Sequence, residues 1–239
     1  MSWTLGGGGF ELFCNRDELR TRAVALAPAA SARNGVAYLA PTDGEAGGTW
    51  IAVNEHGLAL CLVNRYPALA GDGFVSRGRL VRELAGAPSA EEVARRLSRL
   101  ESDSEPRYRP FTLLALETGF APRVLAWDGR RVFAPSVDPV SPPIVSSSYD
   151  PAGVEAARRR LWEPVLGAGE ATPDDLLELH RSHRPRRGPL SPCMHRDDAR
   201  TVSLTRVRVT AAAVDLSYAG GPPCRTELSP PLTLNRHGV

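Results

Sequence analysis

The sequence predicts a layered α+β protein, with two largely antiparallel sheets and helices packed on their outer sides. Strand-like segments occur in pairs joined by short turns, which indicates hairpins rather than parallel crossovers. Along the chain the order is strands, helices, strands, helices, strands. We find no internal repeat and no linker rich enough to divide the chain, so we expect a single domain over residues 1–239.

The first half of the chain reads as two hairpins. Their strands are expected at Ser2–Leu5, Phe10–Cys14, Thr49–Asn54 and Leu58–Asn64. If Leu5 pairs with Phe10 across the four glycines between them, Ser2 faces Phe13. Leu58–Asn64 is almost wholly apolar before its last residue, so this strand should be buried on both faces.

Helices and further strands follow. Each of three helices begins with a capping residue. Ser89 opens a capping box, and Asp150 and Thr172 are each followed by a proline at the first helical position. The expected helices are 78–85, 89–101, 150–162 and 172–182. The expected strands are 111–117, 123–127, 130–133, 201–209 and 212–218.

Composition excludes several classes of function. The net charge of +2 gives no electrostatic argument for binding nucleic acid or a membrane surface. No apolar run approaches the roughly 20 residues of a membrane-spanning helix, and no signal peptide is visible. The four cysteines are far apart, which favours reduced thiols and a cytoplasmic protein. Every basic residue is arginine, and the many Ala, Gly, Pro and Arg residues indicate a GC-rich bacterial genome. Nothing indicates an oligomeric state.

Four strongly polar residues, Asn15-Arg16-Asp17-Glu18, follow the buried strand Phe10–Cys14. A polar strand end is ordinarily a solvated surface, where ion pairs contribute little. Two features favour a functional role here: the preceding strand has a buried pattern, and the hairpin lies at the N-terminus.

The segment "NRDE" is followed by "GGTW" (Gly47–Trp50) and by "VNEHGLALCLVNR" (Val53–Arg65). This combination resembles the NRDE family, also called the transport and Golgi organisation protein 2 family, over essentially the whole chain. The second hairpin is also similar to that of choloylglycine hydrolases and penicillin V acylases. The resemblance implies the four-layer αββα sandwich of N-terminal nucleophile hydrolases, and hydrolysis of a small amide or acyl bond. In such enzymes the first residue is the nucleophile and its α-amine is the base.

The resemblance also implies roles for individual residues. Arg16 would hydrogen-bond the nucleophile, and Asp17 would hold its ammonium group or the substrate amide. Asn64 matches the position of an oxyanion-hole side chain in the related acylases. Asn15 and Glu18 would brace the turn around these groups and contact substrate.

Three further residues are candidates for binding substrate. Trp50 either lines a ligand cleft or belongs to the core at a strand start. Arg200, in "ARTVS", matches an arginine of the family, although it equally suits a surface position. Ser147 lies in a run of three serines where the acylases carry an asparagine, so full acylase chemistry is in doubt.

The first residues depart from the pattern of the family, whose members generally begin Met-Cys-Thr. Here the chain reads Met1-Ser2-Trp3, and Ser2 is a candidate nucleophile. The expected hairpin register instead places a residue three positions before Ser2 opposite Arg16. Our hypothesis is that about three N-terminal residues, including a nucleophilic cysteine, precede the sequence shown, with Met1 replacing a valine. Without them we expect no hydrolase activity.

Two other interpretations remain open. The protein could be a non-enzymatic carrier of haem or lipid that uses the same cleft, or a degenerate hydrolase that binds a partner. In each enzymatic or carrier case the expected partner is a small molecule.

A metal or haem site is a further possibility. Four residues form the pattern H-x2-H…C-x-H: His180, His183, Cys193 and His195. Neighbouring arginines disfavour a cation. We therefore expect no metal and no cofactor, with haem as the alternative, ligated by Met194 or His195.

Overall fold

The structure is a computed structural model that describes residues 1–239 except 68, 103–105, 136–140, 168–170 and 237–239. The strands are β1 (Ser2–Gly6), β2 (Gly9–Leu19), β3 (Leu26–Arg33), β4 (Val36–Thr42), β5 (Ile51–Asn54), β6 (Ala59–Asn64), β7 (Phe111–Leu116), β8 (Arg123–Trp127), β9 (Val132–Phe133), β10 (Ala199–Val209), β11 (Ala213–Ala219) and β12 (Leu232–Asn235). The helices are α1 (Arg77–Leu84), α2 (Ala90–Ser98), α3 (Pro151–Gly167) and α4 (Pro173–Arg181), with a 3₁₀ turn at Arg99–Glu101.

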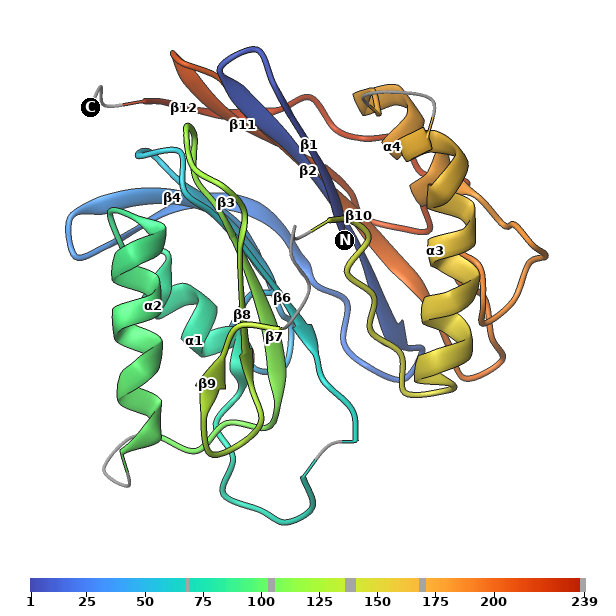
Figure 1. The fold of residues 1–239 in the computed structure, drawn as a ribbon, viewed down its shortest axis with the longest axis horizontal. Coiled ribbons are helices and arrows are strands. Elements are labelled where there is room, and N and C mark those ends of the chain that lie inside the picture. The colour runs from blue at the N-terminus through green and yellow to red at the C-terminus, as the bar shows by residue number, and fades with distance from the viewer. Residues whose placement is uncertain (68, 103–105, 136–140, 168–170, 237–239) are drawn as a thin grey trace.

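These elements form four layers (Figure 1). One sheet has the strand order β1-β2-β10-β11-β12, and the other runs β3-β4-β5-β6-β7-β8-β9. Every strand pair within the two sheets is antiparallel. Helices α1 and α2 cover the outer face of the seven-stranded sheet, and α3 and α4 cover the five-stranded sheet. The predicted αββα sandwich is confirmed.

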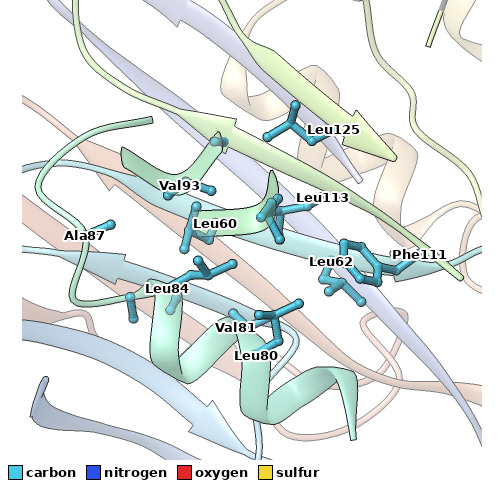
Figure 2. Close-up of a cluster of buried hydrophobic side chains, with 14 of the residues drawn as sticks. Leu60, Leu62, Leu80, Val81, Leu84, Ala87, Val93, Phe111, Leu113 and Leu125 are labelled. Atoms are coloured by element: carbon cyan, nitrogen blue, oxygen red, sulfur yellow. The ribbon is translucent and has the colours of Figure 1, made fainter. Parts of the chain in front are cut away.

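Among the described residues, three hydrophobic clusters hold the layers together. One lies between the seven-stranded sheet and helices α1 and α2 (Figure 2). The second fills the space between the two sheets, and the third joins the five-stranded sheet to α3 and α4. Helix α2 shows how sequence sets this packing, because its buried residues Ala90, Val93 and Leu97 follow helical spacing. No helix in the described part of the chain is long and apolar enough to cross a membrane.

The first hairpin has the predicted register. Leu5 pairs with Phe10 and Ser2 pairs with Phe13. The turn is made by Gly7 and Gly8, both with positive φ, a conformation that matches the twist of the flanking strands. The register therefore fixes which residues of β2 face the amino end of the chain.

Strand β2 is longer than predicted, and this corrects our placement of the "NRDE" segment. The segment continues the strand to Leu19 and does not form a turn. Asn15 pairs with Leu204 of β10, and Arg16 pairs with Ser203. A neighbouring strand supplies the backbone partners, so four polar residues can stay extended. Successive side chains in a strand point to opposite faces, and Arg16 and Asp17 therefore have different surroundings.

Strands β3, β4 and β12 were not predicted. Most residues of β3 are exposed, so it lacks the apolar alternation that marks a half-buried strand. Strand β12 has only four residues, and three of them are exposed. The predicted strand 130–133 is reduced to the two residues of β9.

Asn54 fixes the second hairpin through a complete set of buried hydrogen bonds. Its Nδ2 donates to the carbonyl oxygens of Ala85 (2.9 Å) and Ala87 (2.7 Å). Its Oδ1 accepts from the backbone N–H groups of His56 and Leu58, both at 3.1 Å. The side chain thus ties the β5–β6 turn to the end of α1.

We expect Asn54→Ala to lower the free energy of unfolding by about 2–3 kcal/mol, because buried donors and acceptors lose their partners. Urea denaturation measures the change. Asn235→Ala, at an exposed position of β12, is the matched control and should change stability by less than about 0.5 kcal/mol. Equal effects of the two substitutions would contradict the assignment.

Candidate active site

One cavity of about 790 Å³ opens where β2 and β6 end, and we call it the main cavity. Seven of the nine residues predicted to be catalytic or substrate-binding line it: Asn15, Arg16, Asp17, Glu18, Trp50, Asn64 and Ser147. Met1, at the amino end of the chain, also lines it. The volume lies in the range of small-molecule sites, roughly 300–1,000 Å³.

Arg16 is held by two carboxylates and a ring. Its Nη2 donates to Asp43 at 2.6 Å and to Glu18 at 3.0 Å. Its guanidinium lies over Trp50, with Cζ 4.6 Å from the ring centroid. The side chain is only 9% exposed. Such a guanidinium is fixed in position and direction before any ligand arrives.

Asp43 is the main anionic partner of Arg16. Burial acts to raise the pKa of the Asp43 carboxyl, but a backbone hydrogen bond from Ala46 and the charges of Arg22 and Arg16 outweigh it. The pKa therefore lies below its ordinary value, and the carboxylate stays charged at neutral pH.

Asp17 points to the opposite face of β2, where helix α3 packs. It accepts a hydrogen bond of 2.5 Å from the Thr201 hydroxyl, and Arg158 of α3 lies 3.3 Å from its carboxylate. Its neighbour on this face, Asn15, donates to the carbonyl oxygens of His180 and Pro192, both at 2.9 Å. These contacts attach the wall of the main cavity to α3 and to the segment before β10.

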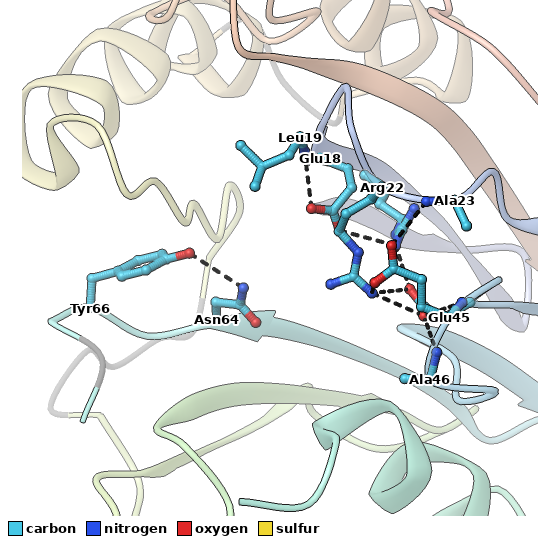
Figure 3. A network of polar contacts seen from close by, with 10 residues as sticks. Glu18, Leu19, Arg22, Ala23, Glu45, Ala46, Asn64 and Tyr66 are labelled. Atoms are coloured by element: carbon cyan, nitrogen blue, oxygen red, sulfur yellow. Dashed lines mark hydrogen bonds and ion pairs between the residues drawn. The ribbon is translucent and has the colours of Figure 1, made fainter. Parts of the chain in front are cut away.

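Asn64, at the end of β6, faces the same cavity from the other sheet. Its Nδ2 donates to the Tyr66 hydroxyl at 3.4 Å (Figure 3). The Ser146 hydroxyl donates to the Asn64 carbonyl at 2.6 Å, which holds the three-serine segment, including Ser147, beside it. Figure 3 shows the side-chain amide of Asn64 next to Tyr66, apart from the charged group that contains Glu18 and Arg22.

The amino end is paired with the segment before α3. The ammonium group of Met1 donates to the Ile144 carbonyl at 2.7 Å, and Ile144 N–H donates back to the Met1 carbonyl at 2.9 Å. The Cys14 thiol lines the main cavity as well. A hydrogen bond from Cys61 lowers the pKa of the Cys14 thiol, burial opposes this, and the positive amino end adds to the lowering.

The other two of these nine residues, Ser2 and Arg200, lie away from the cavity lining. Ser2 is fully buried, and its hydroxyl is 2.8 Å from Nε2 of His180. Arg200 is exposed on β10, where it pairs with Glu18 along the backbone. Neither position gives a side chain access to the main cavity.

His180 is a buried imidazole near the end of α4, and it faces Ser2 of β1. Burial lowers its pKa well below the ordinary value, and the positive amino end and Arg158 contribute to the lowering. As pH falls below about 6.5 the unfolded chain takes up a proton that the folded chain does not, so stability falls.

We expect His180 to cost about 1.4 kcal/mol of stability per pH unit below 6.5, until its folded pKa is reached. Thermal unfolding of the unchanged protein and of His180→Gln, compared between pH 7.5 and pH 5, measures this. The difference between the two proteins should shrink as the pH falls. A parallel decline in both would contradict the prediction, and His56→Gln is the control.

The position of Trp50 in the cavity lining depends on a close approach between the backbones of Gly48 and Gly78. A Cβ added at Gly48 would lie 2.3 Å from the backbone of Gly78, so the "GGTW" segment can reach the start of α1 only with glycine. Thr49 N–H donates to the Gly78 carbonyl at 3.0 Å. The Nε1 of Trp50 is buried and has no hydrogen-bond partner among the described residues.

Sequence reasoning missed several charged residues of the cavity lining, and among them Asp43 contacts Arg16 and Arg158 contacts Asp17. Asp43 follows β4, a strand that was not predicted, and Arg158 is one of three consecutive arginines in α3. Asp43 lies in "TDGE", which indicates a turn but gives no sign of a partner in β2.

Comparison with solved structures defines the class of fold. The chain is similar to a Caenorhabditis elegans N-acylethanolamine-hydrolyzing acid amidase ortholog, with a TM-score of 0.56 and 13% identity, over 86% of this chain and 91% of that one. It is similar to a variant of the conjugated bile acid hydrolase from Clostridium perfringens, with a TM-score of 0.54 and 11% identity, over 97% and 95%. The fold is that of N-terminal nucleophile hydrolases.

The family follows from the sequence match. Residues 9–148 match the family Transport and Golgi organisation 2, and the chain belongs to it. No curated protein matches the chain.

Proposed function

We propose that the protein hydrolyses a small amide or acyl bond with an N-terminal nucleophile. The observation that carries the proposal is the position of Arg16, which lines the main cavity together with the amino end of the chain and Asn64. A buried guanidinium and an amide N–H facing one small-molecule cavity suit the charge that develops in acyl transfer.

The nucleophile in this proposal is the thiol of a cysteine that precedes Met1. In the observed register paired positions of β1 and β2 sum to 15, as Ser2 with Phe13 shows. If β1 is extended by two residues on the N-terminal side of Met1, the first of these two residues lies opposite Arg16. Ser2 is less suitable because it is fully buried against His180.

The proposed reaction needs four groups. The thiol attacks the carbonyl carbon, and the α-amine of the same cysteine takes the thiol proton and passes it to the leaving group. Asn64 donates to the oxyanion, and Arg16 holds the nucleophile. Water then hydrolyses the thioester and frees the thiol. Asp17, already bound to Thr201 and Arg158, keeps this end of β2 in place.

The carrier interpretation has less support. Charged and polar side chains from both sheets line the main cavity, whereas haem and lipid tails need a largely apolar one. The ring of Trp50 is covered by the Arg16 guanidinium. Haem and lipid binding therefore remain outcomes of the test below.

The experiment compares two proteins: the chain shown, and the same chain extended by Met-Cys-Thr with valine in place of Met1. Both are assayed on a panel of amides and acyl esters, with N-terminal sequencing to establish that the cysteine is free, and with haem titration in parallel. We expect hydrolysis only from the extended protein. Replacement of the added cysteine by alanine should abolish it.

Equal hydrolysis by both proteins would contradict the proposal. In that case Cys14→Ala shows whether the cavity thiol of β2 is the nucleophile instead. A shift of the haem Soret band in both proteins, without hydrolysis in either, would support the carrier function.

A further inference from the structure

Two histidines and two cysteines meet at one point outside the main cavity: His183, Cys193, His195 and Cys224. One ligand atom from each residue lies within 4.8 Å of the others. His183 follows α4, Cys193 and His195 lie before β10, and Cys224 lies between β11 and β12. The set differs from the one suggested by sequence spacing, because His180 bonds Ser2 and Cys224 takes the fourth place.

We propose that these four residues form a structural zinc site of the Cys2His2 type. The distances fit this metal. Zinc bonds thiolate sulfur at about 2.3 Å and imidazole nitrogen at about 2.0–2.1 Å, so a sulfur and a nitrogen of one tetrahedron lie about 3.6 Å apart. The Nε2 of His195 lies 3.5 Å from Sγ of Cys193 and 3.6 Å from Sγ of Cys224.

His183 supplies a separate observation. Its Nε2 is buried and has no hydrogen-bond partner among the described residues. Its ring meets that of His195 edge to face, with centroids 5.1 Å apart. A buried imidazole nitrogen ordinarily has a partner, and a metal ion supplies one here.

The nearby arginines are compatible with this ligand set. Two thiolates cancel the charge of one Zn²⁺, so the loaded site is neutral and repels no cation. One contact must change on metal binding. Arg187 donates to Nδ1 of His195 at 3.3 Å, whereas a metal on Nε2 leaves Nδ1 protonated. Arg187 is exposed and free to turn away.

The site joins three parts of the chain, namely the segments after α4, before β10 and between β11 and β12, and it adjoins the wall of the main cavity. Met194, between two of the ligands, lines that cavity. Its N–H donates to the Thr201 hydroxyl at 2.8 Å, and the same hydroxyl bonds Asp17. Zinc at this point would hold the segment that carries Met194 against β10, so its role is structural.

The test uses the whole chain purified under reducing conditions and stripped of metal with a chelator. We expect titration with Zn²⁺ alone to load about one ion per chain, measured by elemental mass spectrometry after gel filtration. With Co²⁺ alone we expect the strong visible bands of a tetrahedral site and the near-ultraviolet band of thiolate-to-cobalt charge transfer. This spectrum depends on no variant and therefore remains informative if a variant fails to fold.

Matched variants identify the ligands. Cys224→Ser and His183→Ala should each lower the zinc content at least tenfold at equal metal concentration. Cys61→Ser and His56→Ala, which change the same residue types elsewhere, should leave about one ion per chain. A Co²⁺ spectrum without the charge-transfer band, zinc content unchanged in Cys224→Ser, or an intact mass showing a Cys193–Cys224 disulfide under reducing conditions would overturn the proposal.

Discussion

Arg16→Ala in the extended protein should lower kcat by roughly 10²–10³-fold, because the nucleophile loses the guanidinium that holds it and the loss of one fixed donor in an active site usually costs about this much. Arg16 is held by Asp43 and Glu18 at 2.6 Å and 3.0 Å and faces the main cavity, so its guanidinium is in place before substrate binds. Arg16→Lys keeps the charge but loses the planar fork, and we expect it to recover only part of the rate. Steady-state kinetics on the best substrate of the panel measure both effects.

Arg206→Ala is the matched control for this prediction. Arg206 belongs to the same sheet, pairs with Glu11 at 2.6 Å and lies over the Phe13 ring, but it does not line the main cavity. Arg206→Ala therefore removes an ion pair with a carboxylate and a contact with an aromatic ring, as Arg16→Ala does, but it changes no residue that lines the main cavity. If the two substitutions reduce kcat equally, Arg16 acts through stability and the proposed role is wrong.

Phe111→Ala should lower the free energy of unfolding by about 3–5 kcal/mol. Phe111 opens β7, is completely buried and packs in the cluster beneath α1 and α2 (Figure 2). Removing its ring leaves a cavity that neighbours such as Leu62 and Leu113 cannot fill without moving strands. Urea denaturation at constant pH, with the midpoint and slope both fitted, measures the loss.

Phe120→Ala is the corresponding surface substitution. Phe120 is 66% exposed in the turn between β7 and β8, so we expect a change below about 0.5 kcal/mol. A cost of less than about 1.5 kcal/mol for Phe111→Ala would contradict the view that this cluster holds the helices on the sheet.

Most of the fold was predicted from the pattern of hairpins in the sequence. Short turns between strands indicated antiparallel sheets, and the assumed pairing of Leu5 with Phe10 across the glycines gave the observed register. The extension of β2 through Arg16 could not be predicted, because its support comes from β10, almost 190 residues later in the chain. Strand β3 was not predicted because most of its residues are exposed, and an exposed edge strand need not show apolar alternation in its sequence.

The candidate site was predictable only where family motifs marked it. Arg16 and Asn64 were found through "NRDE" and the second hairpin, and both line the main cavity. Asp43, Arg158 and Cys224 were missed, because each meets its partner through the packing of layers and no local spacing records that contact. Ser2 was a candidate nucleophile against which the predicted register already argued; its pairing with Phe13 is confirmed, and its contact with His180 could not be predicted because that residue lies about 180 positions later.

The most direct test of the central claim is the pH dependence of alkylation at the N-terminal cysteine of the extended protein, followed by peptide mass mapping. We expect the apparent pKa of this thiol to lie below the ordinary value of about 8.5, because a guanidinium beside it favours the thiolate. In Arg16→Ala the pKa should rise, while in Arg206→Ala it should stay unchanged. An ordinary pKa that is the same in all three proteins would show that Arg16 does not face the nucleophile, and would contradict the proposed site.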